Sequence, residues 1–171
     1  MPADRQITLR SARTGDVPAI RALVEPLAQE RVLLQKEAVA YYEAIQEFVV
    51  AEDADGSLAG FGALHVMWQD IAEVRTLAVS RDHRGAGVGH LILEELLRRA
   101  RAVGVERVFC LTFEVEFFRR HGFAVMADQT AVDPEVYAEL LRSTDEGVAE
   151  FLDLARVKPN TLGNTRMIRT L

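Results

Sequence analysis

A glycine-rich segment at residues 84–89 has the residue types and spacing to bind an anion. It follows an apolar, strand-like run at residues 74–79 and leads directly into a run with apolar residues at helical spacing. Such a strand–turn–helix junction directs backbone N–H groups at one point, where the helix dipole adds positive charge. Glycines let a ligand approach the backbone, because they have no Cβ. The junction therefore predicts a phosphate or pyrophosphate site, rather than an empty turn, at Arg84, Gly85, Ala86, Gly87, Val88 and Gly89.

Two common phosphate-binding patterns do not fit this spacing. A dinucleotide-binding loop needs Gly-x-Gly-x-x-Gly, and counted from Gly85 its third glycine would fall on His90. A Walker loop needs Gly-Lys-Ser/Thr, and the segment has no lysine. The pattern that does fit is Arg-x-x-Gly-x-Gly, from Arg84 to Gly89.

This pattern resembles the acetyl-CoA pyrophosphate loop of the GNAT family of N-acetyltransferases, which reads Gln/Arg-x-x-Gly-x-Gly/Ala. The lead-in at residues 81–83 and the aromatic-x-x-x-Gly-Phe segment from Phe118 to Phe123 also resemble the family in order and spacing. The resemblance implies acetyl-CoA as co-substrate. We expect no metal, because His65 and His121 have no partner at a metal-ligand spacing. The resemblance further implies one acetyltransferase domain over residues 1–171. The implied fold is a mixed α/β sheet of six to seven strands, splayed between strands 4 and 5 and flanked by helices.

Composition agrees with a compact enzyme. The length of 171 residues fits one domain, and no run approaches the ~20 apolar residues that a membrane span requires. The first residues have no apolar signal-peptide core, so we expect a cytoplasmic protein with no membrane partner. A single cysteine excludes an internal disulfide and a cysteine-cluster metal site. The net charge of −6 argues against a nucleic-acid partner.

Hydrophobic periodicity predicts strands and helices in alternation along the whole chain. The helix that begins at Val17 follows a capping signal at residues 14–16, and a second, poorly marked helix covers residues 33–45. The predicted strands lie at residues 7–10, 48–51, 58–68, 74–79, 107–112 and 123–125. Further helices follow the glycine-rich segment and lie at 114–120 and 134–142, and extended pieces are expected at 151–157 and 165–170.

The resemblance also implies how the rest of the cofactor is bound. In the family, a bulge in the fourth strand lets the pantetheine arm pair with exposed backbone groups. By position, these groups belong here to Leu77, Ala78 and Val79, and one of their N–H groups would stabilise the thioester oxyanion. The asparagine that often follows the fifth strand is missing. Thr112 lies close to that place and could hydrogen-bond the pantetheine.

Acetyl transfer to an amine requires the amine to lose a proton, because free ammonium groups are mostly protonated near neutral pH. Glu73 occupies the position of the glutamate base of some relatives. Strand alternation places Glu73, Arg75 and Leu77 on one face. If that face lines the cleft, Glu73 accepts the proton and Arg75 binds a substrate carboxylate. The alternative is a solvated Glu73–Arg75 pair at the entry of the strand.

Two further residues bear on the chemistry. Phe118 stands where many relatives have a tyrosine that is proposed to protonate the CoA thiolate, so water or another group must do so here. Cys110 could form an acetyl-enzyme, but a small core residue of an apolar strand is the favoured interpretation.

The acceptor is indicated by a second resemblance. Residues 62–66, 111–114, 148–154 and 157–167 resemble the short, acetyltransferase-only N-acetylglutamate synthases. This implies acetylation of L-glutamate or L-glutamine, an amino-acid partner, at the start of arginine biosynthesis. The alternatives are another amine, such as a protein N-terminus or a polyamine, or a non-catalytic acetyl-CoA-binding module. A homodimer stays open. The candidate groups for the substrate carboxylates are Arg75, Lys36, Lys158, Asn160 and Arg166.

Overall fold

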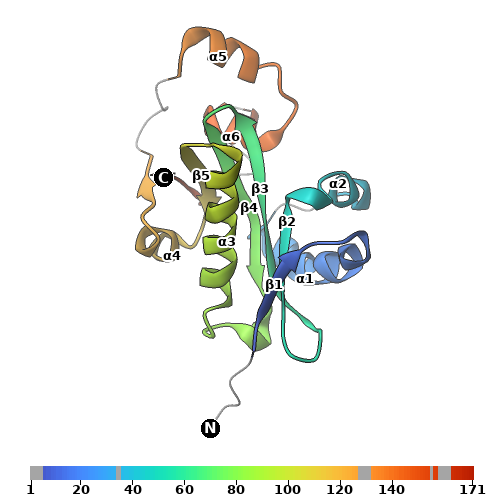
Figure 1. Ribbon diagram of the computed structural model, residues 1–171. Helices are drawn as coiled ribbons and strands as arrows, with labels where there is room; N and C mark the ends of the chain where they lie inside the picture. The colour runs from blue at the N-terminus through green and yellow to red at the C-terminus, as the bar shows by residue number, and fades with distance from the viewer. Residues whose placement is uncertain (1–5, 34–35, 127–131, 155, 158–162) are drawn as a thin grey trace. The chain divides into compact units, whose positions relative to one another are not determined.

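The computed structural model describes residues 6–33, 36–126, 132–154, 156–157 and 163–171 (Figure 1). Within these residues, seven strands form one mixed sheet in the order β1-β2-β3-β4-β5-β7-β6. The strands are β1 (Thr8–Ser11), β2 (Phe48–Glu52), β3 (Leu58–Trp68), β4 (Ile71–Val79), β5 (Arg107–Thr112), β6 (Ala124–Val125) and β7 (Thr165–Thr170).

Helices and short 3-10 turns connect these strands. The described α-helices are α1 (Val17–Gln29), α2 (Ala38–Glu43), α3 (Val88–Val103), α4 (Val115–Arg120), α5 (Pro134–Leu140) and α6 (Glu146–Phe151). The described 3-10 turns are η1 (Thr14–Asp16), η2 (Ile45–Glu47) and η3 (Arg81–His83). None of the described helices combines the length and apolar character needed to cross a membrane.

β4 and β5 pair in parallel, whereas β1 with β2, β2 with β3, β5 with β7 and β6 with β7 pair antiparallel. The parallel register of β4 and β5 joins Ile71 to Arg107 and Glu73 to Phe109, three residue pairs in all. β4 has nine residues, so this register covers only its first part. Short pairing of this kind is what a sheet splayed between strands 4 and 5 requires.

The chain divides into two compact units. Unit one comprises Met1–Leu64 and Val74–Arg99, and unit two comprises His65–Glu73 and Ala100–Leu171. β3 and β4 each contribute residues to both units.

The core of unit one forms where the apolar stripe of α1 packs on the sheet. Ile20 and Val24 are buried one turn apart on α1 and contact a cluster that includes Phe61 and Ala78. Pro18 lies in the first turn of α1, where proline is well tolerated because the backbone N–H that it lacks would have no acceptor within the helix.

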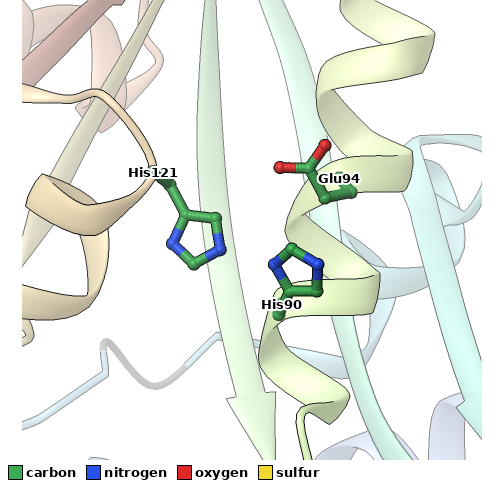
Figure 2. A group of neighbouring side chains, drawn as sticks. All are labelled: His90, Glu94 and His121. Atoms are coloured by element: carbon green, nitrogen blue, oxygen red, sulfur yellow. The ribbon is translucent and has the colours of Figure 1, made fainter.

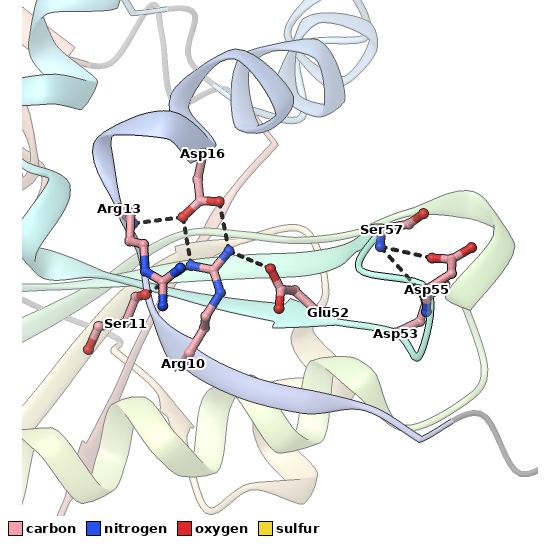
Figure 3. A network of polar contacts seen from close by, with 8 residues as sticks. All are labelled: Arg10, Ser11, Arg13, Asp16, Glu52, Asp53, Asp55 and Ser57. Atoms are coloured by element: carbon pink, nitrogen blue, oxygen red, sulfur yellow. Dashed lines mark hydrogen bonds and ion pairs between the residues drawn. The ribbon is translucent and has the colours of Figure 1, made fainter.

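An ion triad ties the start of unit one together (Figure 3). Arg10 on β1 donates to both carboxylate oxygens of Asp16 at 2.8 Å and to Glu52 Oε1 at 2.5 Å. These bonds raise the pKa of Arg10 and lower the pKa values of Asp16 and Glu52. The triad therefore fixes β1 to the residue before α1 and to the end of β2.

The core of unit two forms around Phe109 on β5. Its ring packs edge-on against Phe151 of α6, with 5.5 Å between the ring centroids. Ile71, Leu140 and Val148 complete the buried cluster. The last strand, β7, pairs with β5 on one side and β6 on the other, both antiparallel.

One sequence prediction was too long and another was wrong. The helix predicted at residues 33–45 is α-helical over Ala38–Glu43 among its described residues, and Leu33 and Ala44 pack against the core. The predicted extended piece at 151–157 is incorrect, because Phe151 ends α6. Asp145 caps that helix by accepting a hydrogen bond from the Val148 N–H at 3.1 Å, a capping signal that the prediction overlooked.

Candidate active site

The glycine-rich loop lies between η3 and α3, where the sequence places it. Gly85 and Gly87 have φ angles of 77° and 79°, which residues with a Cβ rarely adopt. A Cβ at either position would meet no atom within 4 Å, so these glycines serve the backbone conformation and not close packing. Residues 84–87 are exposed, whereas Val88, the first residue of α3, is buried.

The loop satisfies some of its own amides. The Arg84 N–H donates to Arg81 O at 3.4 Å, and the Ala86 N–H donates to His83 O at 3.3 Å. Val88 and Gly89 open α3, and the first amides of a helix have no carbonyl of that helix to donate to. The donors suited to an anion are therefore those at the start of α3, where the helix dipole is positive.

β4 contains a backbone irregularity directly before the residues predicted to bind pantetheine. Thr76 has a φ of 56°, which is strained for a β-branched residue. Leu77 and Val79 are partly exposed and Ala78 is buried. An irregular residue within a strand disrupts the ladder and frees backbone groups, as the expected bulge requires.

The same irregularity affects the prediction that Glu73, Arg75 and Leu77 share one face of β4. Strand alternation does not carry across Thr76, so Leu77 cannot be assigned to the face of Glu73 and Arg75 by counting. A Cβ on Gly62 would lie 3.1 Å from the Leu77 side chain and 3.0 Å from Ile92 of α3. Leu77 thus points to the α3 side of unit one.

Glu73 is a buried carboxyl group in unit two. It is 5% exposed and lies beside Phe109 in the parallel register. Alternation places it on the face of Ile71, whose side chain packs with Phe109 and Phe151 of α6. The carboxyl group of Glu73 is thus buried rather than solvated, and its role as general base stays a prediction.

The neighbouring strand shows why Cys110 is a poor nucleophile. Its side chain is 1% exposed, and burial together with the charge of Glu73 raises its pKa well above the ordinary value. The thiolate is the reactive form, so a thiol that stays protonated does not attack a thioester. Cys110 is a core residue of β5.

Phe118 is likewise a core residue. Its ring lies edge-on to Phe117 and Phe123, with centroid distances of 5.2 and 5.1 Å. Its side chain has no proton to give, and it is 5% exposed.

The predicted pantetheine and substrate groups differ in what they contact. Thr112 Oγ1 is buried and accepts a hydrogen bond from the Glu114 N–H at 2.8 Å, which leaves the hydroxyl hydrogen for another acceptor.

Arg166 donates from Nε to Glu150 O at 2.9 Å and from Nη2 to Phe151 O, and burial lowers its pKa. Two of its donors therefore stabilise the end of α6. Lys36 and Arg75 are partly exposed, and Lys158 and Asn160 lie outside the described residues.

Three further polar residues lie on α3 and after α4 (Figure 2). His90 and Glu94 are exposed on successive turns of α3. His121 Nδ1 lies 2.7 Å from Phe117 O, and because a carbonyl only accepts, that nitrogen carries the proton. The contact gives His121 a structural role at the end of α4.

The protein is similar in sequence to known acetyltransferases. The model of the "Acetyltransferase (GNAT) family" matches residues 19–123. An amino-acid acetyltransferase of Mycobacterium tuberculosis is 53% identical over 99% of this chain and 98% of its own length. An amino-acid acetyltransferase of Neisseria meningitidis is 34% identical over 76% of this chain, which matches only 29% of that longer protein.

Solved structures give the same result and add ligands. Rv2747 from Mycobacterium tuberculosis, in complex with CoA and NLQ, has a TM-score of 0.90 and 54% identity over 96% of this chain and 99% of its own. N-acetylglutamate synthase from Neisseria gonorrhoeae, complexed with CoA and N-acetyl-glutamate, has a TM-score of 0.77 and 26% identity over 97% of this chain and 35% of its own. The predicted fold and the use of acetyl-CoA are confirmed, and the chain belongs to the GNAT family of acetyltransferases.

Proposed function

We propose that this acetyltransferase transfers the acetyl group of acetyl-CoA to the α-amine of L-glutamate or L-glutamine, the first step of arginine biosynthesis. The observation that carries the proposal is the full-length similarity to the amino-acid acetyltransferase of Mycobacterium tuberculosis. The fold similarity to an N-acetylglutamate synthase with bound N-acetyl-glutamate supports the same acceptor class. Because the first relative matches almost end to end, residues 1–171 would work as one acetyltransferase domain.

The loop from Arg84 to Gly89 binds the diphosphate of CoA in this proposal. The positive φ angles of Gly85 and Gly87 and the exposed backbone support that role. The Arg84 side chain is exposed and adds a cation. The pantetheine arm pairs with the backbone of Leu77, Ala78 and Val79, beyond the irregular residue of β4, and Thr112 contributes its hydroxyl group.

Glu73 acts as the general base. Its carboxylate takes a proton from the ammonium group of the amino acid, directly or through one water, and leaves a neutral amine. The amine nitrogen attacks the thioester carbonyl, and a backbone N–H of β4 stabilises the oxyanion. The C–S bond breaks to release CoA as a thiolate. The nitrogen of the new amide then loses its extra proton, which passes through water to that thiolate. A thiolate is a tolerable leaving group because thiols are fairly acidic, near pKa 8.5.

The carboxylates of the amino acid need cations or several N–H donors where water is excluded. Arg75 follows Glu73 by two positions on β4, and strand geometry places both on one face. Lys36, Lys158, Asn160 and Arg166 complete the proposed acceptor groups. An acceptor that carries carboxylate groups suits this mainly basic set better than a polyamine does.

The experiment is release of CoA thiol with purified protein, acetyl-CoA and a panel of acceptors. Turnover with glutamate or glutamine supports the proposal, and the ratio of kcat/KM between the two identifies the acceptor. Turnover only with peptides or polyamines would contradict it, and CoA binding without turnover on any acceptor would indicate a binding module. Arg75→Gln should raise the KM for the acceptor. The matched control, Arg142→Gln in the exposed turn after α5, should leave that KM unchanged.

A further inference from the structure

A buried histidine connects the start of the glycine-rich loop to the β2–β3 turn. His83 is 6% exposed, its Nδ1 lies 2.5 Å from Ser80 Oγ, and its Nε2 lies 3.0 Å from Asp53 Oδ2. We call these three residues the Ser80–His83–Asp53 bridge. All of them belong to unit one, and thirty positions separate Asp53 from His83.

The protonation pattern of the bridge follows from its partners. An ionised aspartate only accepts, so Nε2 carries the hydrogen that Asp53 receives. In a neutral imidazole, Nδ1 is then an acceptor, and the Ser80 hydroxyl donates to it. Both ring nitrogens are thus satisfied in a nearly dry position, where an unpaired polar group would be costly.

Asp53 is itself held rigidly by the hairpin turn (Figure 3). Its Oδ1 accepts from the N–H groups of Asp55 and Ser57, each at 3.2 Å. Its own N–H donates to Ser57 O, and its carbonyl accepts from Gly56, both at 3.0 Å. The carboxylate that faces His83 therefore has a fixed position.

The other end of the bridge reaches the loop through the backbone. The His83 carbonyl accepts the Ala86 N–H at 3.3 Å, and the His83 N–H donates to Ser80 O at 3.1 Å. Ser80 in turn donates its N–H to Ala59 O of β3 at 2.8 Å. A side chain fixed on both ring nitrogens thus orients the carbonyl that shapes residues 84–87.

We propose that His83 and Asp53 are positioning residues that hold the glycine-rich loop ready for the CoA diphosphate. The proposal rests on the diphosphate role of the loop stated above. Residues 84–87 are exposed, and their two glycines allow many backbone conformations, so an unsupported loop would have to be ordered on binding. The bridge removes part of that cost, because it restrains the segment before the ligand arrives.

The test compares ligands that contain the diphosphate with one that does not, and it needs no amino-acid acceptor. The probes are CoA, 3′-phospho-ADP (the nucleotide half of CoA) and pantetheine, with dissociation constants from calorimetry well below the melting temperature. His83→Phe keeps a ring in the buried position and removes both nitrogens. We expect it to weaken CoA and 3′-phospho-ADP by the same factor, about threefold to tenfold, because one ordering restraint is lost. Pantetheine binding should not change.

Two further variants separate positioning from general stability. His83→Gln retains a donor that can reach Asp53 and should restore most of the affinity. Asp133→Ala removes the cap of α5, which accepts from the Glu135 N–H at 2.9 Å, and it should lower the melting temperature without changing nucleotide binding. Equal affinities of wild type and His83→Phe for 3′-phospho-ADP would overturn the proposal, as would an equal loss in Asp133→Ala or an equal loss for pantetheine.

A loop variant tells this inference apart from the function on which it rests. Gly87→Ala strains a position with a φ of 79° and should weaken 3′-phospho-ADP. If it does so while His83→Phe does not, only the positioning role is wrong. If neither variant has an effect, the diphosphate does not bind this loop, and the assignment of the loop is wrong as well.

Discussion

The backbone carbonyl of Ala78 on β4 lies 2.7 Å from the point where a Cβ on Gly60 of β3 would stand. Ile92 of α3 is 3.0 Å from the same point. Real Cβ atoms do not approach a backbone oxygen this closely, so residue 60 must be a glycine for β4 to lie where it does. Ala78 is one of the residues whose backbone is expected to pair with pantetheine.

Gly60→Ala should therefore lower both stability and cofactor affinity. The new methyl group has to push against backbone, and overpacking of this kind costs about 1–3 kcal/mol in unfolding free energy. Gly15→Ala is the matched control, because a Cβ there would meet nothing within 4 Å, and its effect should stay within about 0.5 kcal/mol. Urea unfolding of both variants checks this, and equal stability of the two would contradict the close approach of β4.

Thr76→Gly should be tolerated by the fold in spite of its place within a strand. Glycine adopts the φ of 56° without the strain of a β-branched side chain, so unfolding free energy should rise by up to ~1 kcal/mol or fall by no more than ~0.5. Val74 on the same strand is buried, and Val74→Gly should lose at least ~2 kcal/mol. A loss in Thr76→Gly as large as that in Val74→Gly would show that Thr76 is not strained.

Glu73→Gln and Arg84→Ala should affect different steps. Loss of the general base should lower kcat by roughly 100-fold or more, while the dissociation constant of CoA stays nearly unchanged. Loss of Arg84 should mainly weaken CoA, by about tenfold for one charge-assisted contact. Arg98, an exposed α3 residue paired with Glu95 at 2.7 Å, provides a control. Steady-state rates and calorimetry distinguish the steps, and equal activity of wild type and Glu73→Gln from pH 6 to 9 would remove Glu73 from the mechanism.

The thiol of Cys110 should be silent in the folded protein. Its pKa is raised by burial, with a further contribution from Glu73, so a thiol-reactive dye should label it only after unfolding. Because the folded pKa lies above the unfolded value, this contribution to stability is complete below the ordinary thiol pKa, near 8.5, and is lost as the pH rises beyond it. Denaturant unfolding at neutral and alkaline pH should show a shallower alkaline decline for Cys110→Ala. Rapid labelling of the native protein at neutral pH would contradict this picture.

Local sequence signals were enough to predict the loop and most strands. Gly85 and Gly87 lie between an apolar strand and an amphipathic helix that begins just before Gly89, and both elements form as expected. The family pattern then identified acetyl-CoA. The C-terminal region was harder, because Val148, Phe151 and Leu152 are apolar residues that suit either a strand or a helix until the cap at Asp145 is noticed.

Other features depend on contacts that no local pattern contains. Nothing in the residue type of Thr76 indicates its left-handed φ of 56°, because β-branched residues normally favour extended backbone. The partners Asp53 and His83 are far apart in sequence, and His83 looked only like part of the lead-in to the loop. The charge of Arg166 suits a substrate carboxylate, but in the structure its guanidinium group donates to backbone carbonyls at the end of α6.

The position of β7 in the sequence affects when unit two can finish folding during synthesis. β5 and β6 are synthesised well before Thr165–Thr170, yet each uses that last strand as its antiparallel neighbour. Until these six residues leave the ribosome, both earlier strands have a side without hydrogen-bonded partners, and such edges are prone to pair with other chains. The sheet of unit two therefore cannot be completed before β7 is synthesised. A chaperone that shields nascent strands would protect this enzyme more than it would protect an enzyme whose neighbouring strands are synthesised one after another.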